Sequence, residues 1–411
     1  MTAHSRTVRR RDSSEAGFTM IEMLIAVAIM MTVTGAVFAL MNPSQGIFQT
    51  QPEVSDMQQR LRVGVDSMAK DLVMAGAGTY AGSAAGALYN FFAPVMPYRV
   101  GDVDDDPAKN VFYRADAITI LYVPPTPSQT TIRDAMPKTA EQLKVNEQSN
   151  CPRTKTGEID QHDALCGMKE GMRALIFDNQ GNWDAITITS VQDEALHLGY
   201  DGELSVSYAA GSNITQVATH TYYLKTDVAT KTFQLMHYDG YHTDLPVVDN
   251  VVSLQFQYFG DPLPPTLLPN KPLSGSGPWT TYGPKPPDLA TTFAPWPKGE
   301  NCAFMVDPVS GAQVSRLPVL GGGVGSVPLT EAMLKDGPWC PNASAPDRFD
   351  ADLLRIRRVR VKLRVQVAQV ALRGPAGVLF TYGGTSTGGA RLVPDQEIRF
   401  DITPRNMNLG R

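Results

Sequence analysis

The chain has 411 residues, enough for one large domain or for two to three small ones. Hydrophobic residues make up 43% of the chain and charged residues 19%, which is the composition of a folded protein with a core of its own. The net charge of -5 gives no general reason to expect a nucleic acid or an acidic substrate, and 35 glycines with 31 prolines indicate a loop-rich, mainly β structure.

A basic segment followed by a long apolar segment opens the chain. Residues 1–17 carry four arginines, and residues 18–41 hold a single charged side chain, Glu22. The apolar segment is long enough to cross a bilayer as a helix, and the arginines before it predict a cytoplasmic amino terminus. Three simpler interpretations are a secretory signal cut near Ala39, a plain anchor and a lipoprotein signal. The segment is long for a secretory signal, an anchor leaves Glu22 unexplained, and no cysteine follows the leader.

The residues around Gly17 resemble the class III signal of type IV prepilins. The run 16–27 reads AGFTMIEMLIAV, so the glycine, the phenylalanine, the glutamate and the apolar stretch come in the order typical of that family. The resemblance implies that a prepilin peptidase cuts between Gly17 and Phe18 and methylates the new amine of Phe18. It also implies an assembly role for Glu22, whose carboxylate would meet the Phe18 amine of a neighbouring subunit, because an unpaired charge is unstable in hydrocarbon.

The helix is expected to continue beyond the apolar segment. Pro43, with Gly46 nearby, predicts a break in the form of a kink or a short unwound piece. Apolar residues then recur at steps of three and four, at Val54, Met57, Leu61, Val65, Met68 and Leu72. This pattern predicts a helix with one apolar face, which packs on the chain's own β-domain or, alternatively, binds a partner. Gly76 and Gly78 are expected to end the helix.

Seven short runs predict strands, namely 117–123, 173–177, 185–191, 219–224, 232–238, 251–258 and 358–367. Their alternation and the turn signals between them predict antiparallel sheet. The predicted fold class is therefore α+β, with a long amino-terminal helix, transmembrane and then amphipathic, packed on an antiparallel β-sheet domain as in pilins. Several of these stretches, and residues 56–78 before them, are similar to PilW-like minor pilins and to J-type pseudopilins.

Five segments are predicted along the chain. Residues 1–17 form a cleaved leader, and residues 18–78 form the transmembrane and stalk helix. Residues 79–260 form a periplasmic β-rich domain, which the strands of residues 347–411 complete. Residues 261–346 are rich in proline, glycine and serine, which is typical of a long irregular insertion.

The four cysteines fit two disulfides in an exported protein, and none belongs to a CxxC pair. By proximity we pair Cys151 with Cys166, and Cys302 with Cys340, where a disulfide would pin the insertion. Free buried thiols and a metal site are the alternatives. The spacing of Cys151, His162 and Cys166 is not a standard one for zinc.

No motif supports an enzyme, and we expect no catalytic residue, no cofactor and no metal centre. The GxSxG run at residues 384–388 lacks the helix that should follow a nucleophile elbow. Asp102, Asp104 and Asp106 are a weak candidate for a calcium site. A solvated acidic loop is the plainer interpretation, since the EF-hand spacing would place Pro107 where glycine is needed.

A basic stripe lies on the last predicted strand. Arg358, Arg360, Lys362 and Arg364 share one face, and apolar residues alternate with them. Such a stripe can bind the DNA backbone, whereas the plainer interpretation is the water-facing side of a half-buried strand. We do not expect nucleic acid as a partner.

The resemblance implies a structural function, that of a PilW-like minor pilin that helps to prime or cap type IV pilus assembly. The alternatives are a type II secretion pseudopilin of the filament tip and a tip-borne adhesin or DNA-uptake module. The implied partners are a prepilin peptidase, major and other minor pilins or pseudopilins, the inner-membrane assembly platform and, before assembly, membrane lipid. The implied location is the inner membrane, as a single-pass protein with a cytoplasmic amino terminus and a periplasmic carboxy-terminal domain, and then a pilus or pseudopilus.

Overall fold

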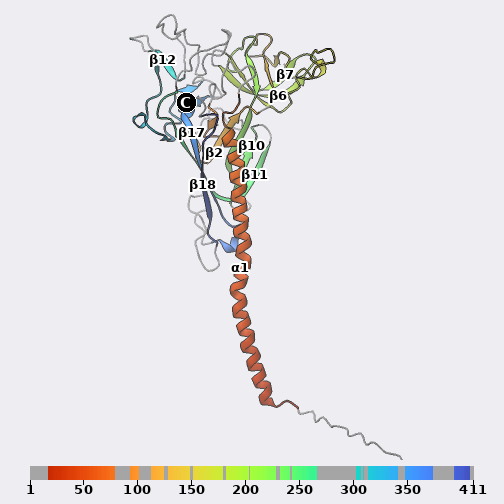
Figure 1. Ribbon diagram of the computed structural model, residues 1–411, viewed down its shortest axis with the longest axis vertical. Coiled ribbons are helices and arrows are strands. Elements are labelled where there is room, and N and C mark those ends of the chain that lie inside the picture. Colours follow the sequence, from red (N-terminus) through yellow and green to blue (C-terminus); the bar gives the residue numbers. More distant parts are fainter. Residues whose placement is uncertain are drawn as a thin grey trace, which may run out of the picture. The chain divides into compact units, whose positions relative to one another are not determined.

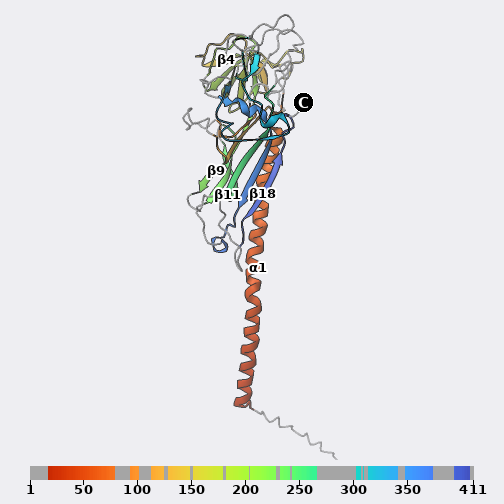
Figure 2. The same ribbon diagram turned by 90° about the vertical axis from the view of Figure 1, so that its left-hand side faces the viewer.

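The computed structural model contains one long helix and two main β-sheets (Figures 1 and 2). The chain forms two compact units, Met1–Ser55 and Asp56–Arg411. The structure describes residues 17–78, 93–100, 113–124, 128–148, 151–178, 182–202, 204–227, 232–240, 243–265, 302–306, 309, 313–340, 348–373 and 393–407.

Helix α1 runs without interruption from Met20 to Met74, over 55 residues. The helix therefore has no unwound piece near Pro43, and of the two forms predicted for the break only the kink stays a prediction. A proline removes one main-chain donor and clashes with one preceding carbonyl, at a cost of about 3 kcal/mol, while the hydrogen bonds on both sides of it can continue the helix.

The second part of α1, within the larger unit, is amphipathic as predicted. Met57, Leu61, Met68 and Leu72 are buried, and the polar side chains of the opposite face are exposed. The helix ends at Met74, after which the glycines at 76 and 78 adopt positive φ angles of 70° and 98°. The apolar stripe thus packs on the chain's own β structure, which confirms the first of the two interpretations.

The larger sheet has eight antiparallel strands in the order β1-β2-β9-β10-β11-β17-β18, with β14 also paired to β11. The strands are β1 (Val95–Met96), β2 (Ala117–Tyr122), β9 (Ala218–Asp227), β10 (Thr232–Tyr238), β11 (Asp244–Gly260), β14 (Val327–Leu329), β17 (Ile356–Val365) and β18 (Gln396–Ile402). Alternate residues of β17 are buried, which is the pattern of a strand with one face in a core.

The smaller sheet has six strands in the order β3-β8-β5-β6-β7-β4. They are β3 (Gln129–Thr131), β4 (Gln142–Lys144), β5 (Arg173–Phe177), β6 (Trp183–Gln192), β7 (His197–Asp201) and β8 (Asn213–Gln216). Its two edges meet, because Ile132 bridges Val145 and the Asn146 amide donates to the Thr131 carbonyl. The strands therefore close into a small barrel around a core of their own.

This barrel is inserted between two neighbours of the larger sheet. Strands β2 and β9 pair directly in that sheet, and the barrel lies between them in the sequence. Residues 79–260, predicted as one β-rich domain, thus contribute to two sheets. The seven predicted strands are all present, which confirms the α+β fold with a helix followed by an antiparallel sheet domain.

The described part of residues 261–346 is more ordered than the predicted irregular insertion. It contains β12 (Phe304–Val306) paired with β13 (Gln313–Ser315), and β14 of the larger sheet. It also contains β15 (Trp339–Cys340), which pairs with β16 (Phe349–Asp350). Short 3-10 turns complete the fold: η2 (Gln161–Asp163), η3 (Gly321–Gly323), η4 (Ala351–Arg355) and η5 (Val370–Leu372).

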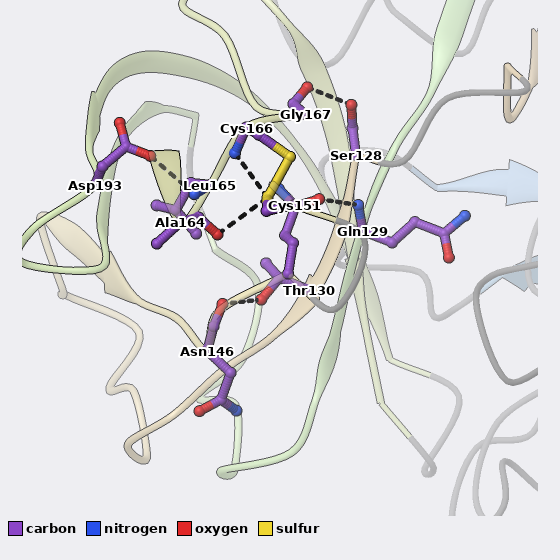
Figure 3. The surroundings of a disulfide bond; sticks show 11 residues. Ser128, Gln129, Thr130, Asn146, Cys151, Ala164, Leu165, Cys166, Gly167 and Asp193 are labelled. Atoms are coloured by element: carbon purple, nitrogen blue, oxygen red, sulfur yellow. Dashed lines mark hydrogen bonds between the residues drawn. A yellow bond between two sulfur atoms is a disulfide. The ribbon is translucent and has the colours of Figure 1, made fainter. Parts of the chain in front are cut away.

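Both predicted disulfides are present. Cys151 pairs with Cys166, with their Cα atoms 5.6 Å apart, and Cys302 pairs with Cys340, with their Cα atoms 5.0 Å apart. Figure 3 shows the first of them beside the barrel, where the Leu165 amide donates to the Asp193 carboxylate at 2.8 Å. This disulfide joins residues 15 apart in the sequence, so it restricts the unfolded chain and thereby stabilises the fold.

Candidate functional site

The amino-terminal end of α1 carries a capping box. The backbone amide and the hydroxyl of Thr19 donate to Glu22 Oε2 at 2.9 and 2.8 Å, and the Glu22 amide donates to Thr19 Oγ1 at 3.4 Å. A threonine followed three residues later by glutamate satisfies two helix-end donors in this way, and the negative charge suits the positive end of the helix dipole. The box therefore fixes the start of α1 two residues after Phe18.

The same contacts hold the Glu22 carboxylate against the residue that follows Phe18. The side chains of Phe18 and Met20 are 90% and 85% exposed. An added Cβ at Gly17 would meet nothing within 4 Å, so the backbone around the expected cut is open.

An exposed apolar span follows the capping box. Residues Met20–Met41 form 22 residues of helix that are long and apolar enough to cross a membrane, and none of them is buried within the chain. Apart from Glu22, no charged side chain lies in this span. Lipid or the helices of other subunits are the surroundings in which such a surface is stable.

The basic stripe of β17 is largely paired within the chain. Arg360 binds both carboxylate oxygens of Asp401 at 2.7 and 2.9 Å, and Arg358 lies 3.5 Å from the same group. Arg364 pairs with Asp395 at 3.2 Å. A phosphate backbone would have to compete with these carboxylates, so the geometry disfavours the DNA-binding interpretation of the stripe.

A histidine cluster that the sequence analysis missed lies between α1 and the larger sheet. His220 of β9 and His237 of β10 stack with their ring centroids 5.0 Å apart, and His220 Nδ1 lies 2.7 Å from His237 Nε2. Asp71 of α1 faces both rings, with its Oδ2 at 3.5 Å from His220 Nδ1 and 4.0 Å from His237 Nε2. The hairpin of β9 and β10 could have suggested that the two histidines are neighbours, since His237 pairs with Tyr222, two residues from His220, but no sequence signal links them to Asp71.

Two tyrosines hold this cluster in place. The Tyr222 hydroxyl donates to Asp71 Oδ2 at 2.6 Å, and the Tyr122 hydroxyl lies 3.1 Å from His220 Nε2. Burial, opposed by the charge of Asp71, lowers the pKa of both His220 and His237. Both imidazoles are therefore neutral at pH 7, and each keeps one nitrogen lone pair.

A second buried polar cluster lies where residues 261–346 meet β17. Asp350 and Asp352 are buried, and with Asp336 they form a group of carboxylates that could hold a cation. The Arg355 side chain is fully buried, and its Nε lies 2.5 Å from Asp352. Burial raises the pKa of Asp350 to about 7 and that of Asp352 to about 6. A buried arginine already neutralises one carboxylate here, which is typical of a structural ion pair.

Two motifs weighed in the sequence lie outside the described residues. These are the calcium candidate at Asp102, Asp104 and Asp106 and the GxSxG run at 384–388.

The exposed apolar helix with its capping box, followed by an antiparallel sheet, is the arrangement expected of a membrane-anchored, single-pass protein of the type IV pilin-like kind. Residues 12–38 match the family model described as "Prokaryotic N-terminal methylation motif", which is the prepilin-like signal. The motif implies processing by a prepilin peptidase and assembly with other pilins. No curated protein and no solved structure matches the chain.

Proposed function

We propose that the chain is a minor pilin, PilW-like in kind, that helps to prime or cap type IV pilus assembly. In this role it is a structural, non-catalytic subunit. It is anchored in the inner membrane with its sheet domain in the periplasm, and the assembly platform then inserts it into the filament.

The observation that carries the proposal is the capping box at the start of α1. The Thr19 contacts hold Glu22 at the same helix end as Phe18, where a neighbouring subunit's methylated amine would be its natural counter-charge. Within hydrocarbon, pairing of the carboxylate with that amine is favoured far over leaving either charge alone. The exposed apolar span supplies the surface for helix packing inside the filament.

The size of the sheet domain supports a low-copy position at the tip. The unit Asp56–Arg411 contains the eight-stranded sheet and the inserted barrel. A subunit that carries so much structure beyond its helix would crowd a uniform shaft, whereas a tip has free space on one side.

Deletion and re-expression test the proposal. We expect a deletion strain to lose most surface pili while keeping the secretion of exported enzymes, and the full-length gene to restore piliation. The chain isolated from membranes should begin at N-methyl-Phe18 in intact-mass measurement and amino-terminal sequencing. Loss of secretion with normal piliation would favour the pseudopilin of a type II secretion filament, and an uncut chain starting at Met1 would contradict both functions.

A further inference from the structure

Two imidazole nitrogens and one carboxylate oxygen, each able to bind a metal ion, converge between α1 and the larger sheet. They are His220 Nδ1, His237 Nε2 and Asp71 Oδ2, and the distances between them are 2.7, 3.5 and 4.0 Å. Donors around a tetrahedral zinc ion lie roughly 3.3 Å apart, since each bond is about 2.0 to 2.1 Å long. The three distances bracket that value, so one ion can reach all three atoms after shifts of a few tenths of an ångström.

We propose that Asp71, His220 and His237 form a divalent transition-metal site that binds Zn²⁺ and clamps helix α1 to strands β9 and β10. Two imidazole nitrogens and one carboxylate oxygen are a ligand set that zinc accepts. A water molecule completes the coordination. Calcium and magnesium prefer oxygen ligands throughout, so the two nitrogen donors select against them.

The surroundings of the three ligands are those of a built metal site. The Tyr122 hydroxyl lies 3.1 Å from the second nitrogen of His220 and can accept its N–H, which is the tautomer in which Nδ1 offers its lone pair to the ion. Tyr222, which is buried, donates to the Asp71 oxygen and fixes the direction of that carboxylate. Such outer partners orient ligands, and their loss typically weakens metal affinity about 10- to 100-fold.

An ion can reach the site from solvent. The side chains of His220 and His237 are 22% and 26% exposed, whereas that of Asp71 is 8% exposed. The cluster is therefore open on the histidine side and closed on the helix side. Asp239 adds a further negative charge beside both histidines, opposed at His220 by Lys70.

The position of the site gives the ion a structural role. Asp71 lies in the last turn of α1, and the histidines lie on two adjacent strands far away in the sequence. An ion that binds only the folded arrangement stabilises it, as a crosslink between distant segments does. The inference stands independently of the proposed pilus function.

Zinc titration of the full-length chain tests the site. The protein, purified in detergent micelles and stripped with a chelator, is titrated with Zn²⁺ alone by calorimetry, and its thermal unfolding midpoint is followed. We expect one saturable equivalent and a rise in the midpoint. His220→Gln and His237→Gln should each weaken binding by more than about 10-fold, and Tyr122→Phe by about 10-fold.

A matched control separates this site from surface binding. His162 is 80% exposed and lies 3.0 Å from Glu194, so His162→Gln removes a surface histidine–carboxylate pair and should leave zinc binding unchanged. X-ray absorption on the zinc-loaded, unsubstituted chain should show two imidazoles and oxygen ligands, and it decides the matter even if a histidine variant fails to fold. Absence of a saturable equivalent, full binding by both histidine variants, or loss of binding in His162→Gln would overturn the site and leave a hydrogen-bonded network only.

Discussion

Asp350 is a carboxyl group whose surroundings favour its protonated form. Burial raises its pKa to about 7, although the amides of Gly337 and Asp352 donate to it at 2.6 and 2.8 Å. The folded state thus binds this proton more tightly than the unfolded state does, since an ordinary aspartate has a pKa near 3.8. The resulting stability is fully present below about pH 4 and is lost as the pH rises towards 7.

Asp350→Asn should flatten this pH dependence. One pKa unit corresponds to about 1.4 kcal/mol. In the unsubstituted chain, we therefore expect the deprotonation of Asp350 to lower the free energy of unfolding by roughly 2 kcal/mol as the pH rises from 5 to 7.5. Urea unfolding of the full-length chain at the two pH values measures the difference. The exposed Asp201→Asn serves as control, and an unchanged slope in Asp350→Asn would contradict the assignment. Asp352 contributes in the same direction, so some slope should remain.

Arg355 joins residues 261–346 to the start of β17. Its Nη1 donates to the Pro262 carbonyl at 2.9 Å and its Nη2 to the Pro318 carbonyl at 2.6 Å, while Nε faces Asp352. Three partners in three directions match the planar fork of a guanidinium, which a lysine ammonium cannot reproduce.

We therefore expect Arg355→Lys to destabilise the fold by about 2 to 4 kcal/mol, because buried carbonyls and a carboxylate lose their donors. Denaturant unfolding at neutral pH measures this change. The exposed pair of Arg114 and Asp116 offers a matched control, since Arg114→Lys should change stability by less than about 1 kcal/mol. Equal effects of the two substitutions would show that the buried contacts contribute little.

At the scale of elements, α1 packs closely on the larger sheet at Gly64. A Cβ there would lie 2.8 Å from Leu363 Cδ2 on β17 and 3.1 Å from Val248 Cγ2 on β11. Glycine weakens a helix interior by about 1 kcal/mol relative to alanine, so its presence here reflects the need for close packing.

Gly64→Leu should destabilise the fold by about 1 to 3 kcal/mol, because the added side chain overpacks the interface between helix and sheet. Arg62→Leu places the same side chain on the exposed face of the same helix and should change stability much less. Thermal unfolding of the two variants in the same detergent compares them. If Gly64→Leu were as stable as Arg62→Leu, the close approach would not constrain this position.

At the scale of the whole molecule, the start of α1 permits a test that separates helix capping from intersubunit pairing. Glu22→Gln keeps an acceptor for the capping box but removes the charge, whereas Thr19→Val keeps the charge and removes the hydroxyl. We expect Glu22→Gln to be cleaved and inserted normally, but to enter filaments at least about 10-fold less, which corresponds to a loss of 1.4 kcal/mol. Thr19→Val should retain most incorporation.

Quantitative immunoblotting of membrane and sheared-filament fractions measures this incorporation. Equal incorporation of the unsubstituted chain and Glu22→Gln would mean that the charge has no part in assembly. A loss in Thr19→Val as large as that in Glu22→Gln would assign the effect to helix capping instead.

Much of the candidate site and of the fold could be predicted from short stretches of the sequence. The motif around Gly17, the apolar span and the alternation of β17 depend on the order of neighbouring residues, and the corresponding elements are present. The two disulfides join cysteines that are adjacent in the order of cysteines along the chain, so proximity was enough to pair them. An unwound piece at Pro43 is absent because the rule for proline treats one residue at a time, while a helix depends on the hydrogen bonds of all its residues.

The sequence by itself determined the amino-terminal signal, the helix with its apolar face and the principal strands, because periodicity and local motifs encode them directly. Only the tertiary structure decided the closure of the inserted barrel, the pairing of the β17 arginines with Asp401 and Asp395, and the meeting of Asp71 with two histidines. Each of these joins residues that are distant in the chain, and strand order and helix packing, which bring them together, leave no mark on the local sequence.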